Sequence, residues 1–300
     1  MARRARGRPV HGWLVVDKPA GPSSAAVVAV AKRALDAAKA GHAGTLDPLA
    51  SGLLPIALGE ATKTVPFVAD ARKAYRFTVR WGAATSTDDA GGEILATSAE
   101  RPDPAAIHAA LAEFTGEILQ VPPQISAVKV AGARAYARAR AGEALDLAAR
   151  PLSVERLEVV AVPDRDTAVL EMTCGKGGYV RSIARDLGAR LGCLGHVAEL
   201  RRLWSGPFTL QGALDWPSLQ AGGPELAARL LPVQAALAGI PELACPPEAA
   251  LRLLNGNPAR FAAGGLPEDA LAWASRDGVP VAVGAWRDGA LHPSRVFVFG

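Results

Sequence analysis

Gly41-His42-Ala43-Gly44-Thr45-Leu46-Asp47-Pro48-Leu49-Ala50-Ser51-Gly52 is the stretch on which the fold prediction rests. It is rich in small, loop-forming residues and holds one carboxylate, Asp47, among apolar neighbours. Its three glycines permit tight backbone geometry and the close approach of a partner. Pro48 restricts the residue before it to an extended conformation, so we expect Asp47 to lie outside any helix. We expect the apolar run at 53–58 that follows to be buried.

Two interpretations of Asp47 follow from this stretch. A carboxylate on a rigid loop above apolar elements is a common way to present an active-site acid or nucleophile. Alternatively, Asp47 hydrogen-bonds to its own backbone in an Asx-turn. The composition of the stretch by itself favours the turn.

The chain has 300 residues, half of them hydrophobic, which allows one large domain or a large and a small one. The sequence holds no apolar run of about 18 residues, so we expect no membrane span. Four arginines make residues 1–11 a basic arm, and no apolar stretch of the kind an export signal needs follows it. We therefore expect a cytoplasmic protein.

The three cysteines are isolated, and the five histidines are scattered. This distribution argues against a disulfide framework or a zinc site, so we expect buried structural cysteines and no metal. The net charge is only +4. Arginine suits phosphate recognition through its planar fork. An Ala- and Arg-rich chain can also reflect genomic base composition, so charge alone supports nucleic-acid binding weakly.

Hydrophobic periodicity predicts the main elements. Strands are expected at 13–16, 75–81, 93–97, 152–162, 167–174 and 197–204. Helices are expected after a cap at Ser23 or Ser24, from 103 to 116 and from 179 to 191. Three prolines near 241–247 suggest a boundary before a small β-rich module, with a helix at 248–254 and strands at 270–274, 279–286 and 296–299.

The segment from 126 to 150 differs from the rest of the chain, because it is basic and has few large apolar side chains. Its basic residues and its one tyrosine are Lys129, Arg134, Tyr136, Arg138, Arg140 and Arg150. We expect this segment to be exposed.

The run Gly175-Lys176-Gly177-Gly178 precedes a predicted helix. Such a run could bind an anion through backbone N–H groups, although it lacks the Walker spacing. A tight strand-to-helix turn is the simpler interpretation. Arg181 lies in the first helical turn, where the helix dipole disfavours a cation. We therefore expect a negative group beside Arg181, either a phosphate or a carboxylate such as Asp47.

Several segments together resemble the motifs of the TruB-type tRNA pseudouridine-55 synthases. Residues 42–52 resemble the catalytic motif of that family, and residues 17–24 resemble its first motif. Further similar segments are 73–76, the tyrosine strand; 120–129 with Gly132 and Tyr136, the insertion loop; and 174–182 and 195–202, the last motifs. The resemblance runs in order from about residue 12 to 205. The tail from about 241 resembles the small PUA-like module of the family more loosely.

The resemblance implies an α+β fold, with a mixed, largely antiparallel sheet and flanking helices, as in pseudouridine synthases. A small β-rich C-terminal PUA-like domain is implied as well. The expected organisation is a basic arm at 1–11, a catalytic domain at 12–240 with an RNA-contacting insertion at about 124–150, and an RNA-binding PUA-like domain at 241–300.

The implied activity is the isomerisation of uridine to pseudouridine at position 55 of the tRNA T-loop, on a flipped-out base. The resemblance makes Asp47 the essential carboxylate, Tyr75 the stacking residue and Arg181 the cation that pairs with Asp47. It implies substrate or RNA contacts for Lys18, His42, Lys129, Arg134, Tyr179, Leu200 and Arg202. Lys18 would contact RNA or support the pocket, and His42 would occupy the space that the flipped base vacates.

The same activity sets the expected partners. Nothing is oxidised and no group leaves in the isomerisation, so we expect no cofactor. The partner would be the T-arm of tRNA. No protein partner is implied, and we expect a monomer.

Two other functions stay open. The first is an RNA pseudouridine synthase that acts on ribosomal RNA or is guided by RNA within a particle. The run Thr45-Leu46-Asp47-Pro48 and the lack of long charged extensions argue against it. The second is a non-catalytic RNA-binding protein with the same fold. The set Asp47, Tyr75 and Arg181 argues against that function.

Overall fold

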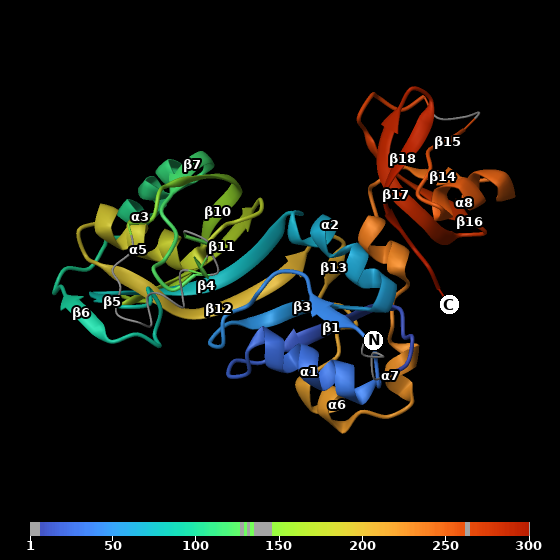
Figure 1. The fold of residues 1–300 in the computed structure, drawn as a ribbon. Coiled ribbons are helices and arrows are strands. Elements are labelled where there is room, and N and C mark those ends of the chain that lie inside the picture. The colour runs from blue at the N-terminus through green and yellow to red at the C-terminus, as the bar shows by residue number, and fades with distance from the viewer. Residues whose placement is uncertain (1–6, 127–128, 131–132, 135–145, 262–264, 300) are drawn as a thin grey trace.

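The structure, a computed structural model, describes residues 7–126, 129–130, 133–134, 146–261 and 265–299. Two sheets dominate these residues (Figure 1). A long sheet carries the candidate site, and a smaller sheet forms the C-terminal part of the chain. None of the helices in the described ranges is both long enough and apolar enough to cross a membrane.

The long sheet has one continuous strand order. The order is β1 (Gly12–Lys18), β3 (Ser51–Leu58), β12 (Gly195–Ser205), β4 (Lys73–Trp81), β11 (Thr167–Cys174), β10 (Arg150–Asp164) and β7 (Gly116–Gln120). At its margins, β2 (Ala40–His42) pairs with β3, and β13 (Phe208–Thr209) pairs with β12. Only β3 and β12 pair in parallel among these strands. The expected mixed, largely antiparallel sheet is confirmed.

Helices flank the two halves of this sheet (Figure 1). The helix α1 (Ser24–Ala34) begins at the N-cap Ser23, whose side chain accepts a hydrogen bond from the Ala26 N–H. It packs with β1 and β3 in one hydrophobic cluster. The helix α5 (Val180–Arg190) buries Val180, Ile183 and Leu187 against β4 and β11 in another. The three- and four-residue spacing of the apolar side chains produces both buried faces.

Shorter elements complete this part of the chain. They are η1 (Gly59–Lys63), α2 (Val65–Ala69), the β5 (Ala83–Thr85) and β6 (Ile94–Thr97) hairpin, α3 (Pro104–Ala110), η2 (Leu111–Phe114), the β8 (Lys129–Val130) and β9 (Ala133–Arg134) pair, α6 (Trp216–Ala221), α7 (Glu225–Ala228) and η3 (Val233–Leu237). The sequence did not predict β7. It is an edge strand with four of its five residues not buried, including Leu119 at 75% exposure, so it lacks an apolar alternation.

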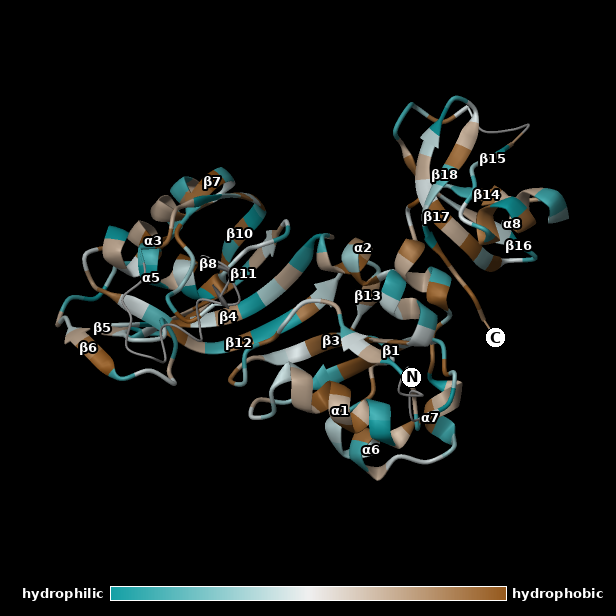
Figure 2. Cartoon of the chain, viewed as in Figure 1, coloured by the Kyte–Doolittle hydropathy of each residue, from teal (hydrophilic) through white to brown (hydrophobic). Residues whose placement is uncertain are grey.

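The C-terminal sheet has the order β14 (Glu242–Ala244), β16 (Leu271–Arg276), β17 (Val279–Arg287), β18 (Ala290–Val296) and β15 (Ala259–Arg260). With α8 (Pro247–Leu254) it encloses a core of its own. The predicted last strand at 296–299 is wrong, because the strand ends at Val296. Phe297 and Phe299 instead pack with Trp13 in a cluster that includes residues of both sheets. Figure 2 shows hydrophobic colouring at the chain end that follows β18. The packing of Phe297 and Phe299 between the two sheets accounts for these apolar residues outside a strand.

Candidate active site

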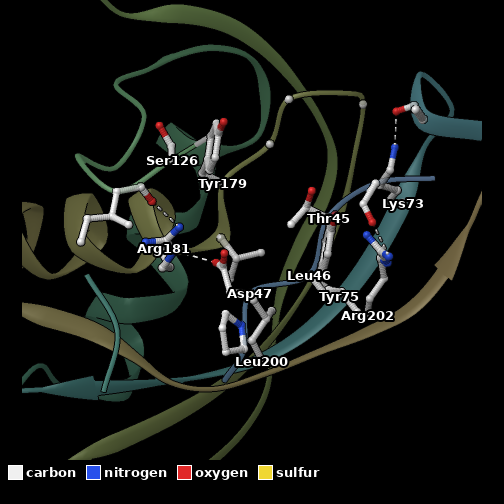
Figure 3. Close-up of a pocket in the computed structure, with 18 residues that line it drawn as sticks. Thr45, Leu46, Asp47, Lys73, Tyr75, Ser126, Tyr179, Arg181, Leu200 and Arg202 are labelled. Carbon is white, nitrogen blue, oxygen red and sulfur yellow. Dashed lines mark hydrogen bonds and ion pairs between the residues drawn. The ribbon is translucent and has the colours of Figure 1, made fainter. Parts of the chain in front are cut away.

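A cavity of about 440 Å³ opens where the Asp47 loop, β4, β12 and the start of α5 meet. Figure 3 shows Asp47 turned toward Arg181, with Tyr75 and Arg202 across the cavity. Six of the ten residues named from the sequence line it: Asp47, Tyr75, Tyr179, Arg181, Leu200 and Arg202. The fold thus brings together residues that lie up to 155 positions apart in the chain, since Asp47 and Arg202 both contribute.

The loop that carries Asp47 is held on both sides of the carboxylate. On one side, the buried Ser24 hydroxyl donates to the Leu46 carbonyl and accepts from the Leu46 N–H, both at 2.8 Å. On the other side, the Pro48 carbonyl accepts from the Gly21 N–H at 2.7 Å and from Lys18 Nζ at 3.3 Å. Asp47 lies outside any helix, as predicted. Ser24 therefore fixes the loop, while its neighbour caps the helix.

Two of the three glycines in the loop have the predicted role. Gly52 has φ +97°, and a Cβ there would lie 2.3 Å from the Arg202 carbonyl oxygen. Only glycine allows β3 and β12 to approach so closely at this point. Gly44 has φ +85° and lies against the Arg202 guanidinium. Gly41 differs from the prediction, because it has open space around it within β2.

The central contact is an ion pair between Asp47 and Arg181. Arg181 Nε lies 3.0 Å from Asp47 Oδ2, and the side chain of Arg181 is only 7% exposed. Arg181 Nη1 donates to the Thr87 carbonyl at 2.9 Å, and Nη2 donates to the Ile125 carbonyl at 2.8 Å. Every nitrogen of the guanidinium therefore has a partner, and its orientation is fixed. The negative group expected beside Arg181 is the Asp47 carboxylate, which does not support the Asx-turn interpretation.

A second carboxylate was not singled out from the sequence. Asp89 Oδ2 lies 3.9 Å from Arg181 Nε, and its side chain is 14% exposed. In the sequence it is part of an acidic turn, and nothing in its spacing points to Arg181. Only the fold shows that Arg181 lies near two negative charges.

Arg202, expected to contact the substrate or RNA, lines the cavity from a buried position. It is 1% exposed, and its guanidinium donates to the Leu53 carbonyl at 2.7 Å and to the Gly44 carbonyl at 3.1 Å. It also hydrogen-bonds to the hydroxyl of Tyr75, its register partner on β4. Burial raises the pKa of Tyr75, against the opposing charge of Arg202. Arg202 thus joins the Asp47 loop to the Tyr75 ring from beneath the cavity.

Lys18 is completely buried and supports the loop. Its Nζ donates to the Pro19 carbonyl at 2.8 Å, to the Pro22 carbonyl at 2.9 Å and to the Pro48 carbonyl. Of the two roles that the resemblance implied, contact with RNA and support of the pocket, the geometry favours support. Burial lowers the pKa of Lys18 to about 8, although the Asp47 charge opposes the shift.

Lys73 lies at the far end of the cavity. Its Nζ donates to the carbonyls of Ala69, the last residue of α2, and of Ala71, both at 2.7 Å. Burial, reinforced by the charge of Arg202, lowers its pKa to about 8. Burial beside the cavity also raises the pKa of the Cys174 thiol to about 11. The three cysteines are free and buried, as expected.

Tyr179 and Leu200 border the cavity from opposite elements. Tyr179 is the N-cap of α5, and its backbone N–H and carbonyl both hydrogen-bond to the buried side-chain amide of Gln120. Leu200 lies on β12, and its carbonyl accepts from Ser51. The residues 175–178 form the strand-to-helix turn that was expected.

The remaining predicted residues lie elsewhere. His42 is the last residue of β2, half-buried and outside the cavity lining. Lys129 and Arg134 belong to the β8 and β9 pair, but their side chains lie outside the described part of the structure. Tyr136, Arg138 and Arg140 lie outside the described residues altogether. Their predicted contacts with RNA therefore stay predictions.

Comparisons with known proteins cover the whole chain and identify the same family as the sequence motifs. Residues 32–180 match the TruB family pseudouridylate synthase (N terminal domain), and residues 181–238 match the tRNA pseudouridylate synthase B C-terminal domain. The tRNA pseudouridine synthase B of Dinoroseobacter shibae is 60% identical over 100% of this chain and 99% of its own. That of Paracoccus denitrificans is 58% identical over 100% of both chains.

A solved Cbf5-Nop10-Gar1 complex contains a chain with the same fold. It has a TM-score of 0.74 and 26% identity, covering 99% of this chain and 91% of that one. The two family models, the full-length relatives and the shared fold thus define the class as a pseudouridine synthase. Within this class, the chain belongs to the TruB family.

We predict that Lys18→Met destabilises the protein and slows turnover without weakening tRNA binding. The change leaves three carbonyls without their side-chain donor, at a cost of roughly 1–3 kcal/mol in the free energy of unfolding. Chemical denaturation and a binding titration measure the two effects. Lys176→Met is the matched control, since Lys176 is 67% exposed and pairs only with Asp70 in the described contacts. Weaker binding with unchanged stability would instead make Lys18 an RNA contact.

The lowered pKa of Lys73 predicts how stability depends on pH. The folded protein releases the Lys73 proton near pH 8, whereas the unfolded chain holds it to about 10.5. Stability therefore rises with pH between these values, because the unfolded state binds more protons there. Denaturation of wild type and Lys73→Met at several pH values isolates this effect. A difference in unfolding free energy that stays constant from pH 7.5 to 10.5 would show that Lys73 has an ordinary pKa.

Proposed function

We propose that this protein isomerises uridine to pseudouridine at position 55 in the T-loop of tRNA. The observation that carries the proposal is the Asp47 carboxylate, paired with Arg181 at 3.0 Å and 40% exposed at the cavity. The cation is shielded while the carboxylate is open to a ligand. The names of relatives 56–60% identical over nearly the whole chain support tRNA as the substrate.

The proposed reaction requires few functional groups from the protein. The bond from the ribose C1′ to N1 of uracil breaks, the uracil turns, and C5 bonds to C1′. C5 then loses its proton and N1 gains one, either directly from C5 or through solvent. Atoms are conserved overall, so an ionised carboxylate and a shielded pocket suffice. Asp47 acts either by adding to the sugar or base, or by removing a sugar proton. In each case the Arg181 guanidinium, 3.0 Å from the carboxylate, holds it aimed into the cavity.

The other residues that line the cavity suit a flipped-out base. Flipping costs a few kcal/mol, which stacking and pocket contacts must offset. In the proposal the ring of Tyr75 stacks on the uracil, with its hydroxyl held by Arg202. Leu200 supplies an apolar wall, and Tyr179 borders the opening. His42, at the end of β2, would fill the space that the base leaves in the RNA.

The rest of the chain would bind the remainder of the T-arm. We assign this role to Lys129 and Arg134 in the insertion at about 124–150, to the basic arm at 1–11 and to the PUA-like tail at 241–300. All the residues assigned to the reaction lie within 12–240, which we take as the catalytic domain. We expect the enzyme to work in the cytoplasm. The chain is 26% identical to the Cbf5 chain and 60% identical to a tRNA pseudouridine synthase B. This difference favours tRNA as the substrate over an RNA that is selected by a guide RNA within a particle.

We predict that Asp47→Asn abolishes turnover while the protein still folds and binds tRNA. The amide keeps the shape of the side chain but removes its charge, so we expect at least about a thousandfold loss, or ~4 kcal/mol of barrier. Tritium release from C5-labelled uridine in a tRNA transcript measures the rate, and a transcript with cytidine at position 55 is the control. A rate within about tenfold of wild type would reject the role of Asp47.

Arg181→Met is predicted to be nearly as severe as the loss of the carboxylate. It leaves Asp47 without the guanidinium that fixes its direction, and a misplacement of about 1 Å at a reacting group can cost roughly a hundredfold in rate. Arg181→Lys is expected to retain part of the activity, because the charge stays but the fork is lost. Single-turnover rates at saturating enzyme test both variants. Equal rates for wild type and Arg181→Met would contradict the pairing as a catalytic requirement.

A further inference from the structure

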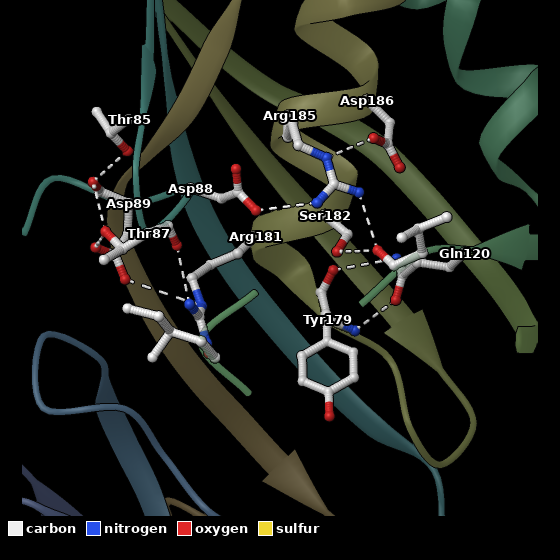
Figure 4. Close-up of polar contacts among 12 residues, drawn as sticks. Thr85, Thr87, Asp88, Asp89, Gln120, Tyr179, Arg181, Ser182, Arg185 and Asp186 are labelled. Atoms are coloured by element: carbon white, nitrogen blue, oxygen red, sulfur yellow. Dashed lines mark hydrogen bonds and ion pairs between the residues drawn. The ribbon is translucent and has the colours of Figure 1, made fainter. Parts of the chain in front are cut away.

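A second arginine on α5 binds the same two chain segments as Arg181. Arg185 lies one helical turn after Arg181, so both side chains leave the same face of the helix. Figure 4 shows the Arg181 guanidinium beside Thr87 and the Arg185 guanidinium between Asp88 and Asp186. Both arginines also donate to carbonyl groups of residues 121–125. The proposed function uses Arg181 only.

The first segment is a strained turn. Asp88 has φ +59°, in the left-handed region that non-glycine residues seldom adopt. Its Oδ2 accepts from Arg185 Nη1 at 3.0 Å, and its side chain is 16% exposed. The residue before it, Thr87, supplies the carbonyl that holds Arg181 Nη1. Arg185 therefore anchors the turn one residue away from a ligand of Arg181.

The second segment follows β7. The Val121 carbonyl accepts from Arg185 Nη2 at 2.9 Å and from the Ser182 hydroxyl at 2.8 Å. Four residues later, the Ile125 carbonyl holds Arg181 Nη2. Gln120 fixes the same segment to the start of α5 through both of its amide atoms. Arg185 thus holds this segment close to the second carbonyl ligand of Arg181.

We propose that Arg185 is a positioning residue for the isomerisation, which sets the two carbonyl groups that orient Arg181 toward Asp47. The inference rests on the proposed function. Both segments must be in place at once, because Arg181 has one nitrogen for each and keeps Nε for Asp47. The planar guanidinium of Arg185 binds Asp88 and the Val121 carbonyl at the same time and so holds both segments. A lysine, with a single ammonium group, cannot reproduce this geometry. Arg185 Nε also pairs with Asp186, so each of its three nitrogens has a partner within the protein.

Kinetics of Arg185→Met and Arg185→Lys test the proposal. We expect Arg185→Met to slow single turnover at least about tenfold, because small displacements of a reacting group carry large rate penalties. The dissociation constant for tRNA should change less than about twofold, and Arg185→Lys should fall between the two proteins. Arg190→Met is the control: Arg190 lies on the same helix, pairs with Glu113 and is 55% exposed. A full rate for Arg185→Met, or weakened binding as its main effect, would overturn the proposal.

A double-variant cycle separates positioning from a general loss of structure. In an Arg181→Lys background, the fork that Arg185 helps to orient is already absent, so Arg185→Met should cost less than about threefold more. An undiminished tenfold loss would mean that Arg185 acts independently of Arg181 and would overturn the proposal. If Arg185→Met does not fold, Asp88→Asn takes its place, because asparagine tolerates the left-handed turn and removes only the charge.

A crystal structure of the Arg185→Met protein gives a readout that does not depend on activity. We expect the Arg181 Nε to Asp47 Oδ2 contact, 3.0 Å in the wild type, to be lost or replaced. An unmoved Arg181 would overturn the role of Arg185 whatever the substrate is. A wild-type protein that makes no pseudouridine in the transcript would instead reject the proposed function and leave the geometric test to decide on Arg185.

Discussion

The buried charge of Arg181 is the constraint on which the site depends. A guanidinium removed from water costs several kcal/mol unless it is paired and hydrogen-bonded, and here it also faces the unfavourable end of a helix dipole. The chain meets this cost by bringing the Asp47 loop, the turn at Thr87 and the segment ending at Ile125 to the three guanidinium nitrogens. Because these segments are distant in sequence, satisfying one cation fixes the geometry of the whole cavity.

Local signals made much of the fold predictable. The restriction that Pro48 places on Asp47, the alternation in β4 and the apolar stripe of α5 are set by neighbours within a few residues, and the structure has each of them. The position of Arg181 at a helix start also predicted a negative partner without reference to any relative. The assignment of particular roles, by contrast, depended on the resemblance of several motifs taken together.

Other features could not be predicted, because they are set by contacts between distant segments. Asp89 is an ordinary turn residue until the fold places it 3.9 Å from Arg181. Arg202 was expected to contact the substrate or RNA, but nothing in the sequence indicated that the close approach of β3 at Gly52 encloses its guanidinium among carbonyls. The last strand was misplaced for the same reason, since Phe297 is buried in a cluster that joins the two sheets and does not belong to a strand. Sequence periodicity records that a side chain is buried and does not record what covers it.

The two partners of the Asp47–Arg181 ion pair differ in solvent exposure, and this difference indicates what the pair contributes. A buried pair adds little to stability compared with apolar packing of the same volume. Arg181 is 7% exposed, however, while the side chain of Asp47 is 40% exposed. The protein bears the desolvation cost mainly on the cation, where carbonyls of two segments offset it, and leaves the carboxylate at the opening of the cavity. Such an arrangement gives a substrate access to a charge whose direction is already fixed, which is the form of preorganisation that lowers a reaction barrier.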